Sequence, residues 1–223
     1  MRNLILIIAM LGLLLCLSGK EILISPVEYR ILEAQEYDLE LTSSKNLGKM
    51  YATLRFDISK AELEKADHYS IFLACCAGID RLKINGENAK YYVTTDLHPL
   101  HFVPVLRHLE LIEADTPATC YSFDPDLFDQ EINSVYIEYQ FPTPAWQTRP
   151  DGSEVLRIGD IPFFYPRNIY SPAELSLSLH TTTFYTMRNA DQITDKGSFR
   201  IIRKKIIDMI DDDIQLDLYK VLN

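Results

Sequence analysis

Glycine is scarce in this sequence, whereas tyrosine and phenylalanine are common. The chain of 223 residues contains 8 Gly against 13 Tyr and 10 Phe, which indicates a strand-rich body with few flexible linkers. Hydrophobic residues make up 47% of the chain and charged residues 24%, enough for one globular domain with a sizeable core. The composition argues against disorder, a collagen helix and a coiled coil.

Positive charge is also in short supply. There are 22 Lys and Arg against 32 Asp and Glu, which gives a formal net charge of −10. Because an acidic surface does not wrap a phosphate backbone, nucleic acid is not expected as a partner.

The sequence lacks the motifs that are typical of common catalytic and cofactor-binding sites. It has no His-Glu-x-x-His, no Gly-x-Ser-x-Gly elbow, no phosphate-binding glycine loop and no dinucleotide fingerprint. No catalytic or cofactor-binding residue is therefore assigned, and no cofactor is expected. The candidates for a metal site are His98, His101 and His108, although Pro99 disfavours helical geometry at His98. Ordinary polar histidines are the favoured interpretation, and a small metal-dependent hydrolase at these three residues is the alternative.

The first 18 residues are predicted to be a signal peptide. After Arg2, residues 4–17 form an apolar run of fourteen residues, which spans about 21 Å as a helix and falls short of a membrane core of about 30 Å. We expect cleavage after Ser18 or Gly19, and export to the periplasm or the outside of the cell without a stable membrane span. Bulky leucines before Cys16 argue against a lipid anchor there.

Three cysteines follow the predicted leader, at Cys75, Cys76 and Cys120. An odd count is not a disulfide framework. Cys75 and Cys76 are adjacent in an alternating segment, which points them to opposite faces and makes a bond between them geometrically poor. Small buried side chains are the favoured interpretation, while a bond from Cys120 to one of the other two stays open.

Strict alternation of apolar and polar residues identifies three strands, at residues 50–58, 133–141 and 174–182. In the first, Ala52, Leu54, Phe56 and Ile58 share one face. Strands of this kind are half-buried in antiparallel sheets. The sequence therefore predicts an antiparallel β-sandwich over residues 19–202.

Weaker signals fill in the rest of this domain. Asn85-Gly86 favours a tight hairpin, and Ser59 with Glu62 has capping-box spacing that predicts a short helix over residues 59–66. Further strands are expected at residues 37–42, 69–76, 81–84, 90–94, 108–113 and 199–202.

The C-terminal residues 203–223 change period and are predicted to form an amphipathic helix. Apolar side chains recur there at spacings of three and four. The helix either packs on the sandwich or docks onto another protein. The residues expected on its apolar face are Ile206, Ile207, Ile210, Ile214 and Leu218.

Two proline-containing segments, residues 143–152 and 162–172, are predicted to be long loops. Aromatic residues lie in or beside them, and these either line a binding surface or close the open end of the core. The candidates for the binding surface are Trp146, Phe164, Tyr165 and Tyr170.

Four segments together resemble a known domain. They are residues 51–58 (YATLRFDI), 79–86 (IDRLKING), 132–139 (INSVYIEY) and 164–166 (FYP). Over residues 35–192 the chain resembles the N-terminal β-domain of aminopeptidase-N-like zinc peptidases. The resemblance implies a saddle-like sandwich, which in those enzymes packs against a helical catalytic domain and helps to shape the substrate cleft.

The same resemblance argues against peptidase activity by this chain alone. Neither the zinc-binding helix of the family nor its Gly-Ala-Met-Glu-Asn substrate loop occurs in the sequence, so no catalytic residue is carried over. We therefore expect an exported, non-catalytic β-sandwich that binds a ligand or another protein, through its aromatic loops or its C-terminal helix. The alternative from the family is an accessory subunit of a separately encoded zinc peptidase.

Overall fold

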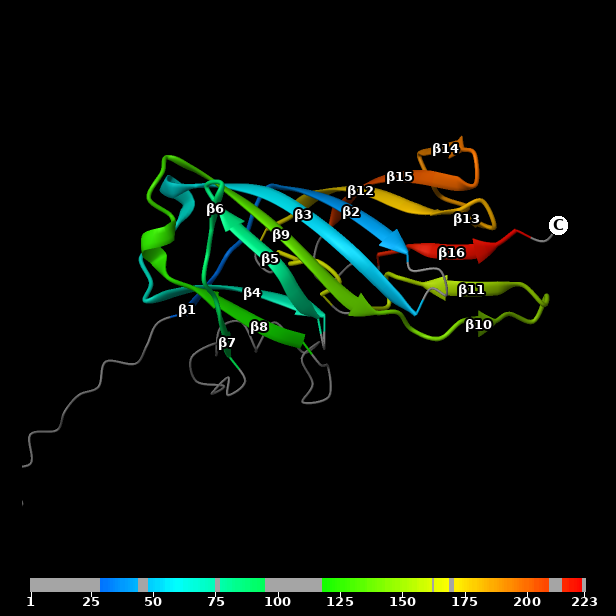
Figure 1. Ribbon diagram of the computed structural model, residues 1–223, viewed down its shortest axis with the longest axis horizontal. Coiled ribbons are helices and arrows are strands. Elements are labelled where there is room, and N and C mark those ends of the chain that lie inside the picture. The colour runs from blue at the N-terminus through cyan, green and yellow to red at the C-terminus, as the bar shows by residue number, and fades with distance from the viewer. Residues whose placement is uncertain are drawn as a thin grey trace, which may run out of the picture.

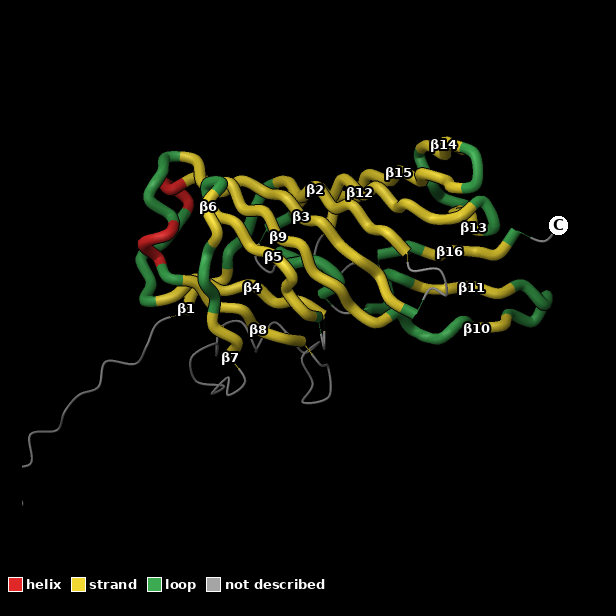
Figure 2. Tube along the Cα trace, in the orientation of Figure 1, coloured by secondary structure: helices red, strands yellow, loops and turns green. Residues whose placement is uncertain are grey.

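The computed structural model describes residues 29–43, 48–74, 77–94, 118–161, 163–168, 171–208 and 214–221, and these residues are mainly β (Figures 1 and 2). Several predictions fall outside these residues: the leader 1–18, Cys75, Cys76, His98, His101, His108, Tyr170 and Ile210.

The largest sheet in the described part of the chain has eight strands. All its neighbours are antiparallel except β2 and β12, which run parallel. In spatial order the strands are β14 (Gln192–Lys196), β15 (Phe199–Asp208), β12 (Ala173–Thr182), β2 (Glu36–Ser43), β3 (Lys49–Ser59), β9 (Ile132–Pro142), β5 (Gly78–Ile84) and β6 (Glu87–Asn88).

Two four-stranded sheets accompany it. In the first, β1 and β4 are parallel and the order is β1 (Tyr29–Ile31), β4 (His68–Ala74), β8 (Ala118–Phe123), β7 (Tyr92–Thr94). The second is antiparallel throughout, in the order β10 (Gln147–Thr148), β11 (Glu154–Arg157), β16 (Asp217–Lys220), β13 (Tyr185–Met187).

The sheets form a sandwich. The two small sheets lie towards opposite ends of the large one (Figure 1), and buried side chains from all three belong to one apolar cluster. Leu54 and Ile137 of the large sheet share this cluster with Leu73 of β4 and Leu218 of β16. The predicted sandwich is therefore confirmed, with two parallel strand pairs in an otherwise antiparallel arrangement.

The three strongly alternating segments form the centre of the large sheet. Along β3 the burial alternates from residue to residue, so that Leu54 is fully buried while Arg55 is exposed. β9 pairs with β3 in register, which places Ile137 opposite Leu54. Each strand thus gives one face to the core and one to solvent, as period-two sequences require.

Of the two local predictions, the tight hairpin at Asn85-Gly86 is confirmed in full and the short helix over residues 59–66 in part. Asn85 and Gly86 have φ values of 55° and 84° and join β5 to β6, as a tight hairpin requires. The predicted helix over residues 59–66 is a shorter 3₁₀ turn, η1 (Lys60–Glu62), whose N-cap Ser59 accepts a hydrogen bond from the Ala61 N–H at 3.3 Å. A second 3₁₀ turn, η3 (Pro125–Leu127), precedes β9.

The amphipathic helix predicted over residues 203–223 is wrong. Residues up to Asp208 continue β15, which pairs with β12 over its whole length, and β16 lies between β11 and β13. A sheet sends neighbouring side chains to opposite faces. Ile206 is accordingly half-buried and Ile207 is 67% exposed, while Ile214 and Leu218 are buried. These residues therefore do not form one apolar partner face.

A buried amide connects the segment before β2 to the loop of residues 163–168. Asn168 accepts hydrogen bonds from the Tyr37 hydroxyl at 2.7 Å and the Ala34 N–H at 3.3 Å, and donates to the Ala34 carbonyl at 2.7 Å. Burial raises the pKa of Tyr37 far above its ordinary value of 10.0. The loop is thus held to the large sheet by a fully satisfied polar contact.

Candidate binding groove

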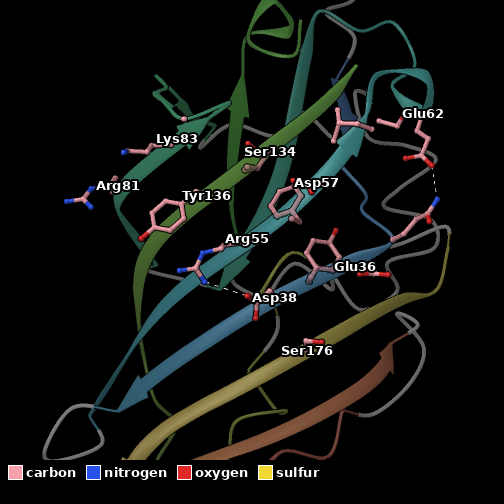
Figure 3. A pocket seen from close by; sticks show the side chains of 17 residues that line it. Glu36, Asp38, Arg55, Asp57, Glu62, Arg81, Lys83, Ser134, Tyr136 and Ser176 are labelled. Carbon is pink, nitrogen blue, oxygen red and sulfur yellow. Dashed lines mark hydrogen bonds and ion pairs between the residues drawn. The ribbon is translucent and has the colours of Figure 1, made fainter. Parts of the chain in front are cut away.

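The outer face of the eight-stranded sheet carries an open groove of about 830 Å³ (Figure 3). The groove crosses β5, β9, β3, β2 and β12, and its floor is made by the solvent-facing residues of these strands. Register aligns them in rows across the sheet: Lys83 lies opposite Tyr136, Tyr136 opposite Arg55, and Arg55 opposite Asp38. The row continues to Ser176 of β12.

Charge is distributed unevenly along this groove. On the β5 side are Arg81 and Lys83, while Glu36 and Asp38 lie on β2. Asp57 of β3 faces the same groove as Glu36 (Figure 3). Opposite charges directed into a shared space recognise a ligand that carries the complementary pattern.

Some of these charges are already paired within the groove. Arg55 Nη1 lies 3.6 Å from Asp38 Oδ2, and its guanidinium lies over the Tyr136 ring at 5.3 Å. Arg81 Nη1 lies 3.3 Å from Glu138 Oε1. The Arg55 and Asp38 side chains are 48% and 59% exposed, so this pair contributes little stability and costs little to open for a ligand.

Tyr136 lies at the middle of the groove between these pairs. Its hydroxyl donates a hydrogen bond to Glu138, and this bond raises the pKa of Tyr136 above 10.0. The phenol therefore stays protonated and presents an aromatic face flanked by two arginines, Arg55 and Arg81.

Lys83, Asp57 and Glu36 are charged groove residues with unused capacity. Within the part of the chain that the structure describes, the side chains of these three residues make no hydrogen bond or ion pair. Sequence analysis missed the groove because its residues are exposed positions of five strands. The alternating pattern predicts that these residues face outward, but it does not predict the strand order that brings them together.

The described aromatic residues that were candidates for a binding surface are buried or half-buried. Phe164 and Tyr165 are buried, so their side chains belong to the core, and the Tyr165 hydroxyl donates to the buried carboxylate of Asp208. Trp146 is half-buried and stacks on Tyr185 with ring centroids 5.5 Å apart. These three aromatics close the sandwich, because apolar rings are more stable in the core than in water.

Among the described residues, no group of three or more His, Cys, Asp or Glu side chains is placed to hold a metal ion. Within the same residues, no helix is both long and apolar enough to cross a membrane. Cys120 is buried, as predicted for a small core side chain.

The fold is similar to that of solved zinc peptidases. An M1 zinc metallopeptidase from Deinococcus radiodurans matches at a TM-score of 0.50 and 14% identity, over 80% of this chain and 40% of that chain. Native leukotriene A4 hydrolase from Saccharomyces cerevisiae matches at a TM-score of 0.53 and 10% identity, over 78% of this chain and 27% of that chain.

These matches concern part of each enzyme, because this chain spans less than half the length of either. No family model matches the sequence, and no curated protein matches it. The resemblance predicted from the sequence is therefore confirmed as one of fold: the chain has the β-domain architecture found in M1 zinc metallopeptidases.

Proposed function

We propose that this protein is an exported, non-catalytic β-sandwich that binds an extended segment of another protein in the groove on its eight-stranded sheet. The observation that carries the proposal is the charge pattern of the groove, with Arg81 and Lys83 at the β5 side and Glu36, Asp38 and Asp57 towards β2. Fold likeness to one part of larger enzymes supports a binding rather than a catalytic role. Export rests on the predicted leader.

The dimensions of the groove define the kind of segment that fits. From β5 to β12 there are four inter-strand gaps of about 4.8 Å each, or roughly 19 Å. An extended chain rises about 3.4 Å per residue, so the floor accommodates about six residues. A matching segment carries acidic side chains over Lys83 and basic side chains over Asp57 and Glu36.

The test uses the fluorescent peptide Glu-Glu-Ser-Ser-Lys-Lys and an all-serine peptide of equal length, with binding measured by anisotropy at low salt. We expect the charged peptide to bind and the serine peptide not to bind. Lys83→Glu and Asp57→Lys should each weaken binding about threefold or more, since exposed charge contacts contribute about 0.2–1 kcal/mol and reversal adds repulsion.

Lys196→Glu is the matched control. Lys196 is an exposed lysine on β14, at the far edge of the same sheet from β5, so its reversal changes the net charge equally without touching the groove. If Lys196→Glu weakened binding as much as Lys83→Glu, attraction would be nonspecific and the groove would not be the binding site. Absence of binding by the unmodified protein would refute the proposal directly.

A second candidate is that the partner is a separately encoded zinc peptidase, to which this chain is an accessory subunit. The fold match to M1 metallopeptidases at 0.50 and to leukotriene A4 hydrolase at 0.53 favours it. Co-purification with a zinc-containing peptidase from the native source, lost on Lys83→Glu but retained on Lys196→Glu, would support both candidates together. A complex that persists in the Lys83→Glu variant would show that the peptidase binds somewhere other than the groove.

A further inference from the structure

The second small sheet presents three arginines on its outer face, away from the groove. Leu218, Leu156 and Met187 are fully or almost fully buried in the core, so Asp217, Arg157 and Arg188 next to them project from the opposite face of the sheet. Val155 and Tyr219 of that face are also buried. Arg157 is the cross-strand partner of Asp217 on one side. On the other side, Arg188 follows Met187, which is the partner of Leu218.

Tyr219 organises two of the guanidinium groups. The Arg188 guanidinium lies over its ring at 4.3 Å and that of Arg149 at 5.0 Å. Tyr219 is only 7% exposed, so the ring is a fixed platform. Guanidinium groups stacked on an aromatic face keep their N–H edges available for carboxylates.

Backbone turns fix the positions of these arginines as well. The Arg149 N–H donates to the Ser153 carbonyl at 2.8 Å, and the Gly152 N–H returns to the Arg149 carbonyl at 2.9 Å. The turn that carries Arg188 is closed by the Ala190 N–H on the Met187 carbonyl at 3.4 Å. A preorganised site loses less entropy on binding.

The acidic residues of this face leave some of the arginine donors unused. Asp217 accepts from Arg149 and from the Tyr219 hydroxyl, each at 3.1 Å. Asp151 accepts from the N–H and the hydroxyl of Ser153, and these bonds, together with the nearby arginines, lower its pKa. The remaining acid, Asp160, is 3.9 Å from Arg157, too far for a strong hydrogen bond.

Two arginines therefore have free capacity within the described part of the chain. Arg188 makes no hydrogen bond or ion pair there; its guanidinium lies over the Tyr219 ring and interacts electrostatically with Asp151. The Nε of Arg157 is buried and has no hydrogen-bond acceptor. The Arg157 side chain as a whole is 42% exposed, so an incoming carboxylate reaches the guanidinium at its exposed atoms.

We propose that Arg149, Arg157 and Arg188, on the outer face of the β10–β11–β16–β13 sheet, form a second binding site that takes an acidic segment of a partner protein. Arg157 and Arg188 flank Asp217 across two inter-strand gaps, or roughly 10 Å. The segment accordingly carries carboxylates about this far apart. Each carboxylate of the segment then accepts two parallel hydrogen bonds from one guanidinium group, which is the contact that arginine makes best.

The test measures the anisotropy of fluorescent polyglutamate with the full protein at low salt, and polyglutamine serves as the neutral probe. We expect polyglutamate to bind and polyglutamine not to bind. Arg188→Glu should weaken polyglutamate binding about fivefold or more, and the loss should shrink as salt is raised. Arg157→Lys keeps the charge but loses the planar fork, and should weaken binding about twofold.

Two control variants decide where polyglutamate binds. Arg203→Glu reverses an exposed arginine on β15, and Lys83→Glu reverses the free lysine of the groove; neither should change polyglutamate binding by more than the general charge effect. Binding lost on Lys83→Glu but not on Arg188→Glu would assign the probe to the groove and overturn this proposal, as would no binding at all. Tighter binding of a single-stranded oligonucleotide than of polyglutamate would also overturn it, because the ligand would then be a phosphate chain.

Discussion

Leu218→Ala and Ile207→Ala are expected to differ sharply in their effect on stability. A helical C-terminal segment would place both residues on one apolar face and give similar losses. In the structure Leu218 is 0% exposed on the central strand of a small sheet, and Ile207 is 67% exposed on β15. Truncating a buried leucine costs about 2–5 kcal/mol of the free energy of unfolding, whereas truncating an exposed isoleucine changes it by about 0.5 kcal/mol or less.

The shift in melting temperature that corresponds to these free energies depends on the size of the protein. For a domain of 150–250 residues, 1 kcal/mol shifts the melting temperature by roughly 2–4 °C, so a loss of about 3 kcal/mol at Leu218 predicts a fall of about 6–12 °C. Calorimetry and urea unfolding followed by Trp146 fluorescence would measure it. Trp146 is the single tryptophan and contacts the ammonium of Lys220 on β16, so it reports on this strand. Equal effects at Leu218 and Ile207 would refute the assignment of a strand.

Three further predictions concern the core. Asn168→Ala should lower the free energy of unfolding by about 3 kcal/mol, because it leaves the Tyr37 hydroxyl and neighbouring backbone groups without partners. Urea unfolding of the double variant with Tyr37→Phe should show a smaller loss than the sum of the two single losses. Gly159→Ala should prevent folding or lower the melting temperature by more than Leu218→Ala does, since its Cβ would lie 1.7 Å from the Ile214 carbonyl oxygen. Burial raises the pKa of Tyr37 and Tyr139 far above 10.0, so the folded state keeps protons that the unfolded state loses, and stability should fall as pH rises above about 10. The tyrosinate absorbance of the buried residues should then appear together with unfolding, whereas exposed tyrosines such as Tyr51 and Tyr92 ionise in the folded protein; ionisation of all tyrosines before unfolding would contradict the burial argument.

The central strands could be predicted because their environment matches their sequence period. β3, β9 and β12 each have a core on one side and water on the other, and their predicted bounds of 50–58, 133–141 and 174–182 lie within one residue of those observed. The parallel pairing of β2 with β12 could not be predicted, since alternation says which face a residue occupies and not which strand lies beside it.

The C-terminal segment was misassigned because its spacing fits two periods. Ile206, Ile210, Ile214 and Leu218 recur every four residues, which keeps side chains near one face of a helix and also on one face of a strand. Ile201 and Ile202 are both buried, so the alternation that would have identified β15 is interrupted. Composition alone offered no means to choose between the two.

The two proposed binding surfaces face away from each other, and this has a consequence for how partners are bound. The groove is on the outer face of the eight-stranded sheet, and the arginines are on the outer face of a small sheet whose inner residues share one core with it. Ligands at the two surfaces are separated by the full thickness of the sandwich, so they do not exclude each other sterically. Because sheets pack about 10 Å apart and the exposed charges are at least that far from one another, screening at about 0.15 M salt leaves little electrostatic coupling. A single ligand that occupied both surfaces would have to wrap around the edge of the sandwich, whereas two separate ligands would meet no steric conflict.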